Sequence, residues 1–250
     1  MSLLRKKHNK PELKELYCVS DDNAPFYYVE AYKMLCTNIE FITAAEKCKN
    51  IMITSTLANE GKTNVSINLA LTLSGYGKKV CLVECDFRRP SIHRFIVTKH
   101  NTNGLTNVLK GEIEIDKAIR KVSGTAMSIL LSGICPPNPS ELLASEKMKS
   151  VVDQLEQDYD YIIYDTPPVL LVTDAAALGK YMDGTIFVVR HDSTEKNLVL
   201  KAKKNLENAG VKIIGAIYSV FSEKNAGSYS SNYSYSYKYY YGSDKEKKDD

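Results

Sequence analysis

The spacing of apolar and polar positions changes repeatedly along the chain, and these changes predict alternating strands and helices. Short runs that are apolar on both faces predict six strands, over residues 51–55, 80–85, 127–131, 161–164, 185–190 and 212–220. Helical spacing predicts helices over residues 25–41, 63–76, 140–157, 174–181 and 194–209, and one or two shorter helices within 107–120, broken at Gly111. Ser140 is the expected N-cap of the third long helix, with Glu141 in its first turn, and Gly210 ends the last helix.

Strands that are apolar on both faces and separated by helices are typical of a parallel sheet that is covered on both sides. Right-handed crossovers between such strands give a three-layer, doubly wound α/β fold with a mostly parallel sheet. Ligands of these folds bind at the carboxyl ends of the strands. The search for chemistry therefore starts at the residues that follow each strand.

Composition divides the 250 residues into three parts. Residues 1–24 are polar and mixed, which predicts a flexible N-terminal arm, and residues 25–221 are long enough for one α/β domain. Residues 222–250 are dominated by Ser, Tyr, Asn, Gly and Lys without a core-forming period, which predicts a disordered tail. This tail holds seven of the 17 tyrosines, at Tyr229, Tyr233, Tyr235, Tyr237, Tyr239, Tyr240 and Tyr241.

Charge and composition exclude several classes of protein. No run approaches the roughly 18–20 apolar residues that a membrane helix needs, and the basic N-terminus is not followed by the apolar segment of a secretory signal. The six cysteines include no C-x-x-C pair, so they indicate free thiols in a reducing cytosol, with Cys81 and Cys85 on the same side of a strand. The net charge of +3 gives no reason to expect nucleic acid.

The first strand leads into Ser-Thr-Leu-Ala-Asn-Glu-Gly-Lys-Thr, residues 55–63, and a predicted helix follows. This order is typical of a phosphate-binding loop of the P-loop NTPase type, although Thr56 stands where the motif usually has its first glycine. Lys62 is expected to reach the β- and γ-phosphates, and the Thr63 hydroxyl to coordinate Mg²⁺. A plain surface turn is the weaker alternative, because a strand precedes the loop and a helix follows it. The expected nucleotide contacts are Ala58, Asn59, Glu60, Gly61, Lys62, Thr63 and Asn64.

Acidic residues follow two other strands. Strand alternation places Glu84 and Asp86 on the same side of a strand end, beside the loop, where two carboxylates can hold Mg²⁺ or accept a proton. Asp165 directly follows an apolar strand, which is the Walker B arrangement and suits contact with Mg²⁺ through water. The alternative is that these acids only cap turns. The predicted metal-binding residues are Thr63, Glu84, Asp86 and Asp165.

Five segments in this order, together with the tyrosine cluster, give the chain a resemblance to a known family. They are residues 30–41, 61–63, 84–90, 136–143 and 165–168. With them the chain resembles the bacterial tyrosine kinases, cytoplasmic autokinases associated with capsular and exopolysaccharide export. The Pro-Pro-Asn-Pro-Ser-Glu-Leu-Leu segment and the tyrosine tail are the specific parts, because phosphate loops occur in many ATPases.

The resemblance implies a protein-tyrosine autokinase that uses ATP and Mg²⁺ and transfers the γ-phosphoryl group to its own tyrosine tail in trans. The catalytic residues that it implies are Lys62, Glu84, Asp86, Arg88 and Asp165. It also implies partners: a separate transmembrane activator or polysaccharide co-polymerase that recruits the chain to the inner face of the membrane, further copies of the chain when unphosphorylated, and a cognate tyrosine phosphatase.

The sequence departs from the family pattern at several positions. Glu84 replaces the usual Asp, Ser219 takes the place of an Asn near the adenine, and the Glu-x-x-Arg-x-x-Arg motif of ring assembly reads Glu30-x-x-Lys33-x-x-Cys36. Glu84 and the altered helix motif keep a second function open, an ATP-dependent scaffold with weak or no kinase activity. A partitioning-type ATPase is disfavoured by the tyrosine tail and by Leu57, which stands where that branch has a lysine.

Overall fold

We analysed a computed structural model of the chain, which describes residues 18–20, 24–44, 48–96, 103–191 and 193–219. The predicted tail, with its seven tyrosines, and most of the predicted N-terminal arm lie outside the described residues. Residues 18–20 of that arm lie against the body of the protein, where the Val19 N–H donates to Asn68 Oδ1 at 2.7 Å. The three-part division of the chain stays a prediction.

The centre of the fold is a seven-stranded sheet in the order β3-β4-β2-β5-β1-β6-β7. Six strands match the six predicted ones: β1 (Asn50–Ser55), β2 (Val80–Glu84), β4 (Met127–Leu130), β5 (Tyr161–Asp165), β6 (Gly184–Arg190) and β7 (Ile213–Ser219). All six run parallel. The seventh, β3 (Arg120–Lys121), is a two-residue antiparallel edge strand that the apolar pattern did not predict.

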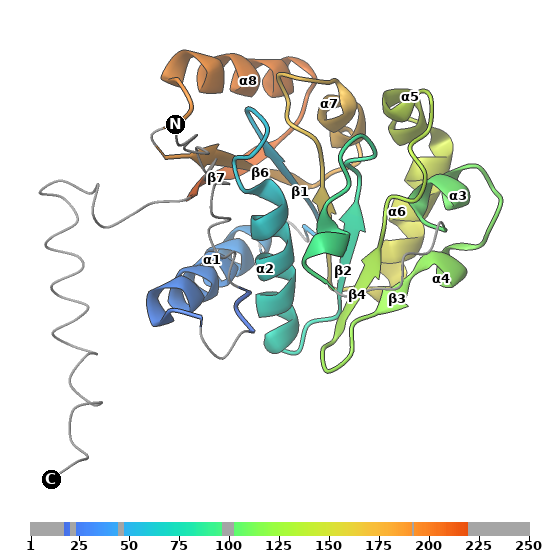
Figure 1. Cartoon of the computed structure of the whole chain (residues 1–250), viewed down its shortest axis with the longest axis horizontal. Helices are drawn as coiled ribbons and strands as arrows, with labels where there is room; N and C mark the ends of the chain where they lie inside the picture. Colours follow the sequence, from blue (N-terminus) through green and yellow to red (C-terminus); the bar gives the residue numbers. More distant parts are fainter. Residues whose placement is uncertain (1–17, 21–23, 45–47, 97–102, 192, 220–250) are drawn as a thin grey trace, which may run out of the picture.

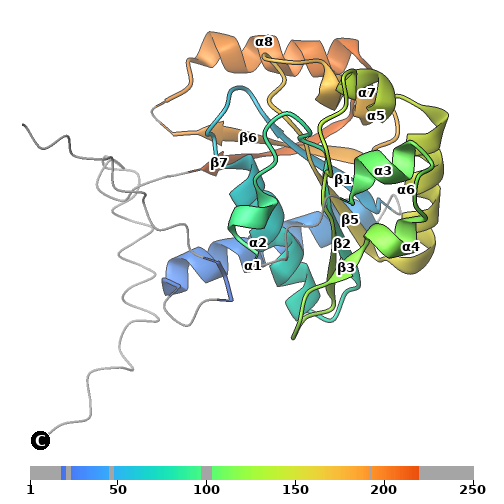
Figure 2. The same ribbon diagram turned by 45° about the vertical axis from the view of Figure 1, so that its right-hand side comes forward.

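Helices cover both faces of the sheet (Figures 1 and 2). They are α1 (Phe26–Ala44), α2 (Lys62–Gly75), the 3₁₀ turn η1 (Ile92–Arg94), α3 (Leu105–Leu109), α4 (Ile115–Ala118), α5 (Pro139–Leu143), α6 (Glu146–Asp158), α7 (Asp174–Gly179) and α8 (Lys196–Asn208). The two short helices α3 and α4 confirm the predicted break at Gly111.

Alternation along the buried strands divides the core into two layers. In β1, Ile51 and Ile53 pack with α1 and α2, whereas Met52 packs on the opposite face with α3 to α8. The predicted three-layer α/β fold is therefore confirmed, and Cys81 and Cys85 do lie on one face. No helix in the described part of the chain is long and apolar enough to cross a membrane.

The predicted helix over residues 140–157 is two helices, α5 and α6. Ser140 is not an N-cap, because it lies inside α5, where its hydroxyl donates to Asp174 Oδ1 at 2.6 Å. The cap of the longer helix is Ser145, whose Oγ accepts from the Met148 N–H at 3.2 Å. Glu141 lies in the first turn of α5, as expected.

Helix α1 carries the residues that align with the ring-assembly motif of the family. Lys33 forms an ion pair with Glu30 of its own helix at 2.7 Å. Cys36 is completely buried beside Ile39, and burial raises the pKa of its thiol to about 12. Cys36 therefore contributes to the core of this chain and has no surface on which a second copy could dock.

Candidate functional site

The strand order brings together the segments that the sequence analysis singled out. β5 lies between β1 and β2, and its Asp165 pairs in register with Ile53 of β1 and with Glu84 of β2. The carboxyl ends of these three parallel strands therefore meet at one edge of the sheet. The phosphate loop leaves β1 at this edge and enters α2 at Lys62.

The backbone of the loop adopts the strained conformations that a phosphate cradle requires. Asn59 has a φ of 65° and Gly61 a φ of 91°, both in the left-handed region. An asparagine tolerates that region better than most residues, and glycine adopts it freely. Gly61 is the N-cap of α2, so the first N–H groups of this helix face the edge of the sheet.

Buried contacts hold the loop in shape. The Glu60 side chain is 1% exposed, and its carboxylate accepts from the Leu57 N–H and from the Thr194 hydroxyl. The Ser219 hydroxyl at the end of β7 donates to the Glu60 carbonyl at 2.5 Å, and Arg190 of β6 donates to the Asn59 carbonyl at 2.9 Å. The last two strands thus support the loop.

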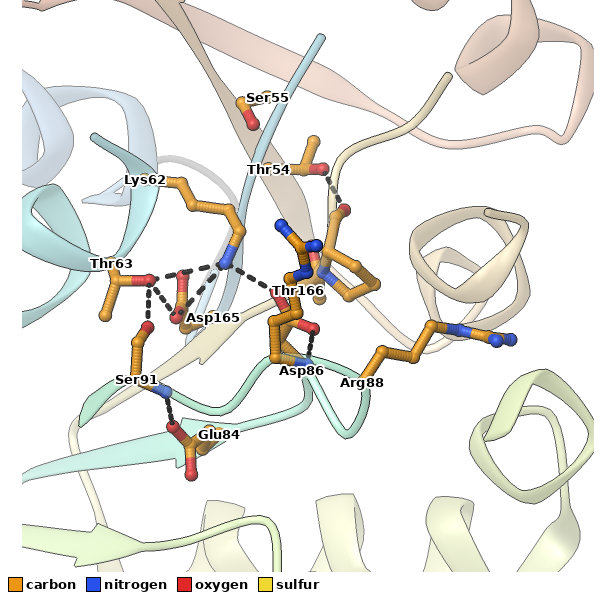
Figure 3. Close-up of polar contacts among 12 residues, drawn as sticks. Thr54, Ser55, Lys62, Thr63, Glu84, Asp86, Arg88, Ser91, Asp165 and Thr166 are labelled. Atoms are coloured by element: carbon orange, nitrogen blue, oxygen red, sulfur yellow. Dashed lines mark hydrogen bonds and ion pairs between the residues drawn. The ribbon is translucent and has the colours of Figure 1, made fainter. Parts of the chain in front are cut away.

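Lys62 lies between two buried carboxylates (Figure 3). Its Nζ is 3.0 Å from Asp86 Oδ2 and 3.6 Å from Asp165 Oδ2. The Thr63 hydroxyl donates to Asp165 Oδ2 at 2.7 Å. Four of the predicted residues, Lys62, Thr63, Asp86 and Asp165, therefore form one connected cluster.

Burial and neighbouring charge act in opposite directions on this cluster. Burial disfavours the Lys62 ammonium, but the carboxylates of Asp165 and Asp86 outweigh it and raise the lysine pKa. Burial raises the pKa of Asp165, and the nearby Lys62 ammonium only partly offsets that rise. The carboxylate of Asp165 is thus held in an unfavourable environment that further positive charge would relieve.

The donor set of this cluster fits Mg²⁺. The Thr63 hydroxyl and the carboxylates of Asp165 and Asp86 are oxygen ligands, which this ion prefers, and it keeps several waters when protein supplies only a few of them. Asp165 is completely buried at the end of β5, beside the start of α2, where a cation would compensate its charge. Within the described ranges no three acidic, histidine or cysteine side chains converge as a metal cluster. The nucleotide's own phosphates would then supply the remaining ligands.

Glu84, a predicted metal ligand, points away from Lys62 (Figure 3). Strand β2 ends at Glu84, and the two carboxylates have different partners: Asp86 contacts Lys62, whereas Glu84 accepts from backbone N–H groups. Both oxygens of Glu84 accept hydrogen bonds from the loops that follow β2 and β4.

Arg88 also lies away from the Lys62 cluster (Figure 3). Its Nε and Nη2 donate to the two oxygens of Asp174 at 3.0 and 3.1 Å, and Ser140 donates to the same carboxylate. Asp174 was not among the predicted site residues. The signal that could have found it is its position: an acid that begins a short helix and is followed by apolar residues is buried only with a partner.

Ser66, Ser91 and Ser132 are further contacts that sequence reasoning missed. Ser66 Oγ donates to Asp165 Oδ1 at 3.1 Å, from one turn beyond Lys62. The spacing of four residues along a helix could have indicated it, because such residues share a face. Ser91 and Ser132 reach the site from separate loops and carry no local signal.

These features define a P-loop nucleotide-binding protein. They are a loop with residues in the left-handed region, a lysine and a hydroxyl at the start of a helix, and acids on neighbouring strands. The sequence family described as AAA domain matches residues 48–213. Tyrosine-protein kinase YwqD of Bacillus subtilis is 40% identical over 188 residues, 75% of this chain and 79% of that protein. The chain belongs to the bacterial tyrosine kinases, which confirms the resemblance seen in its motifs.

Two further relatives agree. The putative tyrosine-protein kinase CapB of Staphylococcus aureus is 33% identical over 201 residues, 80% of this chain and 88% of that protein. The solved kinase domain of the Escherichia coli tyrosine kinase ETK superposes with a TM-score of 0.73 at 32% identity, covering 78% of each chain. The chain spans only about a third (32%) of the full length of that kinase.

Proposed function

We propose that this chain is a tyrosine autokinase that transfers the γ-phosphoryl group of ATP, in the presence of Mg²⁺, to tyrosines of its own C-terminal segment. The observation that carries this proposal is the contact of Lys62 and Thr63 with Asp86 and Asp165 at one edge of the sheet. Membership of the bacterial tyrosine kinases supports the choice of a tyrosine acceptor.

Each residue of the cluster has a distinct part in this reaction. Bound Mg²⁺ supplies charge neutralisation and orients the phosphates. The N–H groups at the start of α2 bind the phosphates, and Lys62 moves from its carboxylate partners to the β- and γ-phosphates. Thr63, Asp86 and Asp165 would hold the metal. The tyrosine oxygen would bond to the γ-phosphorus as the bond to the β,γ-bridging oxygen breaks, ADP would leave, and the phenol proton would pass to a carboxylate of the site. Transfer of this kind depends mostly on positioning and charge, so the chain needs no covalent intermediate.

The last described strand ends close to this site. β7 runs parallel to β6 and β1 and ends at Ser219, whose hydroxyl contacts the phosphate loop. The chain therefore leaves the described structure at the edge of the sheet that carries the site. From Ser219 to Tyr229 there are ten residues and to Tyr241 there are 22, which at ~3.3–3.6 Å per residue extend at most roughly 36 Å and 79 Å. Such lengths would allow delivery of a tyrosine into the site of a neighbouring copy.

Intact-mass spectrometry of the recombinant protein tests the activity. We expect a ladder of added phosphates on the wild-type chain after incubation with ATP and Mg²⁺, and none on Lys62→Met. Thr125→Ala is a matched control, because its hydroxyl bonds only within its own turn, far from Lys62 in the sequence. A single unmodified mass for the wild-type chain would contradict kinase activity and support the ATP-dependent scaffold.

Transfer in trans has its own test. A donor in which all seven tail tyrosines are replaced by Phe is mixed with the Lys62→Met chain, so that the only acceptors belong to the inactive copy. Phosphate on the Lys62→Met chain, rising with the concentration of donor, supports transfer between copies. If that chain stays unmodified while the wild type modifies itself, the transfer is within one copy.

We also propose that phosphorylation ends the association between copies. Each phosphotyrosine adds about −1.5 to −2 charges, so seven would add roughly −10 to −14 to the tail. Such a segment is repelled from Asp86 and Asp165. Light scattering before and after treatment with ATP should record a fall in mass, and an unchanged mass counts against this part of the proposal.

A separate membrane protein and a tyrosine phosphatase complete the proposed system, as the family resemblance implies. Two relatives support a setting in polysaccharide export: one is described as a putative tyrosine-protein kinase in the cps region of Klebsiella pneumoniae, and a solved chimera is named CapA2B2. Co-purification with membrane proteins encoded beside the chain tests the partner, with Lys62→Met as the control for dependence on ATP.

A further inference from the structure

The carboxylate of Glu84 is fully occupied by hydrogen bonds. Its Oε1 accepts from the N–H groups of Ser91 and Ile92 at 2.7 and 2.9 Å. Its Oε2 accepts from the N–H and the hydroxyl of Ser132 at 3.1 and 2.9 Å. The side chain is almost completely buried, and four donors compensate the loss of water around the charge.

These donors come from two different segments of the chain. Ser91 and Ile92 belong to the segment that follows β2 and forms η1, whereas Ser132 follows β4, which is the neighbour of β2 in the sheet. One carboxylate thus ties together two loops that are about 40 residues apart in the sequence. Each oxygen serves one loop, so both oxygens are needed.

The length of the side chain matters for this tie. An aspartate at position 84 would withdraw its carboxylate by about one C–C bond, ~1.5 Å. Hydrogen bonds of 2.7–3.1 Å do not survive such a withdrawal on both sides, because contacts beyond about 3.5 Å no longer count as bonds. The glutamate in place of the family's aspartate is therefore matched to its contacts in this chain.

The tie connects to the phosphate site through a hydroxyl. Ser91 Oγ donates to Thr63 Oγ1 at 3.1 Å, and Thr63 in turn donates to Asp165. Fixing the backbone of Ser91 therefore fixes the orientation of the Thr63 hydroxyl. The hydrogen bonds of the Glu84 carboxylate in this structure go to Ser91, Ile92 and Ser132, and none goes to Lys62, Asp86 or Asp165.

We propose that Glu84 is a positioning residue, which locks the loops after β2 and β4 together and thereby orients Thr63, and that it neither binds Mg²⁺ nor accepts the proton of the tyrosine. This replaces the role predicted for Glu84 from the sequence. The statement about catalysis rests on the proposed kinase function, whereas the statement about the two loops does not.

Glu84→Asp and Glu84→Gln together test the proposal in the full chain. If Glu84 were a metal ligand or a base, the aspartate variant would keep the carboxylate that the chemistry needs, and only the glutamine variant would lose activity, by about 10²–10⁴-fold. A positioning residue predicts that both variants lose autophosphorylation to a similar extent, about 10-fold or more. An aspartate variant as active as the wild type, beside an inactive glutamine variant, overturns the proposal.

Amide hydrogen exchange of the nucleotide-free protein gives a readout that does not depend on kinase activity. We expect exchange at Ser91, Ile92 and Ser132 to accelerate about 10–100-fold in both Glu84 variants. Ser132→Ala, which removes one of the four donors, should accelerate exchange at Ser91 and Ile92 by a smaller factor. Unchanged exchange at these amides in all three variants overturns the proposal.

Ser145→Ala is the matched control. It removes a serine hydroxyl that caps α6, so it lowers stability, but it leaves exchange at Ser91 and the rate of autophosphorylation as in the wild type. Failure of the proposed kinase function is distinguishable, because then even the wild-type chain carries no phosphotyrosine. The exchange measurement still decides whether Glu84 holds the two loops together.

Discussion

Replacing either partner of the Arg88–Asp174 pair should destabilise the protein unequally, although both replacements break the same two hydrogen bonds. Asp174 is fully buried, whereas the side chain of Arg88 is 41% exposed. Arg88→Ala leaves a buried carboxylate that keeps the Ser140 hydroxyl as a donor, so the charge stays in a poorly solvated place. Asp174→Asn removes the buried charge and leaves a guanidinium that water can solvate.

The expected losses in the free energy of unfolding follow from these environments. Removing one partner of a fully buried ion pair costs about 3–5 kcal/mol. Because Arg88 is partly exposed, solvent screens the pair, and we expect about 2–3 kcal/mol for Arg88→Ala. Asp174→Asn keeps the shape and one acceptor oxygen, so about 1 kcal/mol is expected. The double variant should resemble Asp174→Asn alone, since no buried charge is left unpaired.

Urea unfolding of the nucleotide-free protein, followed by far-UV circular dichroism, measures these differences. In a domain of this size 1 kcal/mol corresponds to about 2–4 °C in melting temperature, so Arg88→Ala should melt about 5–10 °C below the wild type. Arg89→Ala, at the neighbouring exposed arginine, is the control and should change stability by less than about 0.5 kcal/mol. The reasoning fails if Asp174→Asn costs as much as Arg88→Ala, or if Arg89→Ala does.

Three further predictions concern other parts of the fold. Burial raises the pKa of the Cys81 and Cys85 thiols and brings that of Cys36 to about 12, whereas Cys135 is exposed. A thiol reagent at pH 8 should therefore label Cys135 in the native protein and these three buried cysteines only after unfolding, and peptide mapping checks this. Gly104→Ala should lower the free energy of unfolding by at least about 3 kcal/mol, because a Cβ there would lie 2.4 Å from the Leu131 carbonyl oxygen. Gly75→Ala is the control: its Cβ would meet no atom within 4 Å, and the variant should stabilise α2 by about 0.5–1 kcal/mol. Equal melting temperatures for the two variants would contradict this prediction. Because burial raises the pKa of Asp165, the folded chain keeps the Asp165 carboxyl protonated to a higher pH than the unfolded chain does. Stability without nucleotide should therefore fall as pH rises through the raised pKa. Urea midpoints measured from pH 4 to 7 should fall less steeply for Asp165→Asn than for the wild type, and parallel profiles would refute the assignment.

The parts of the fold that the sequence predicted are those in which local pattern and burial agree. β1, β2 and β5 are apolar runs buried on both faces, so their signal does not depend on the rest of the chain. The phosphate loop was also predictable from local sequence, because its glycine, lysine and threonine are consecutive. β3 has no such signal, since Arg120 and Lys121 form an edge strand with little burial.

The split between α5 and α6 shows how a continuous helical pattern can mislead. Leu143 and Met148 both enter the core, but they are five positions apart, one more than the spacing of four that keeps two residues on one helical face. The chain absorbs this extra residue at Ala144 and Ser145, where one helix ends and the next is capped. Ser140 was then free to serve Asp174, a contact across 34 residues that no local spacing encodes.

The same distinction separates the two kinds of residue at the site. Lys62, Thr63 and Asp165 were predictable because their positions at strand and helix ends determine where they lie. Glu84 and Arg88 stand at equally suggestive positions, but their side chains are directed by Ser91, Ser132 and Asp174, which approach from other segments. Sequence position predicts where the backbone of these two residues lies. The direction of their side chains depends on how the surrounding segments pack.

If the chain acts as proposed, the charge at the site requires ATP and Mg²⁺ to arrive together. Lys62 contributes one positive charge against the carboxylates of Asp86 and Asp165, so the cluster carries one net negative charge when both are ionised. ATP without metal would bring further negative charge into this buried site. To bind the phosphates, Lys62 would have to leave Asp86 and Asp165, whose negative charge it compensates. Thr63 and Asp165 would hold Mg²⁺, which would compensate the carboxylates and leave Lys62 available for the phosphates. Lys62 is the counter-ion of Asp86 and Asp165 in this structure, and on the proposed function it would become a ligand of the phosphates when ATP and the metal are bound.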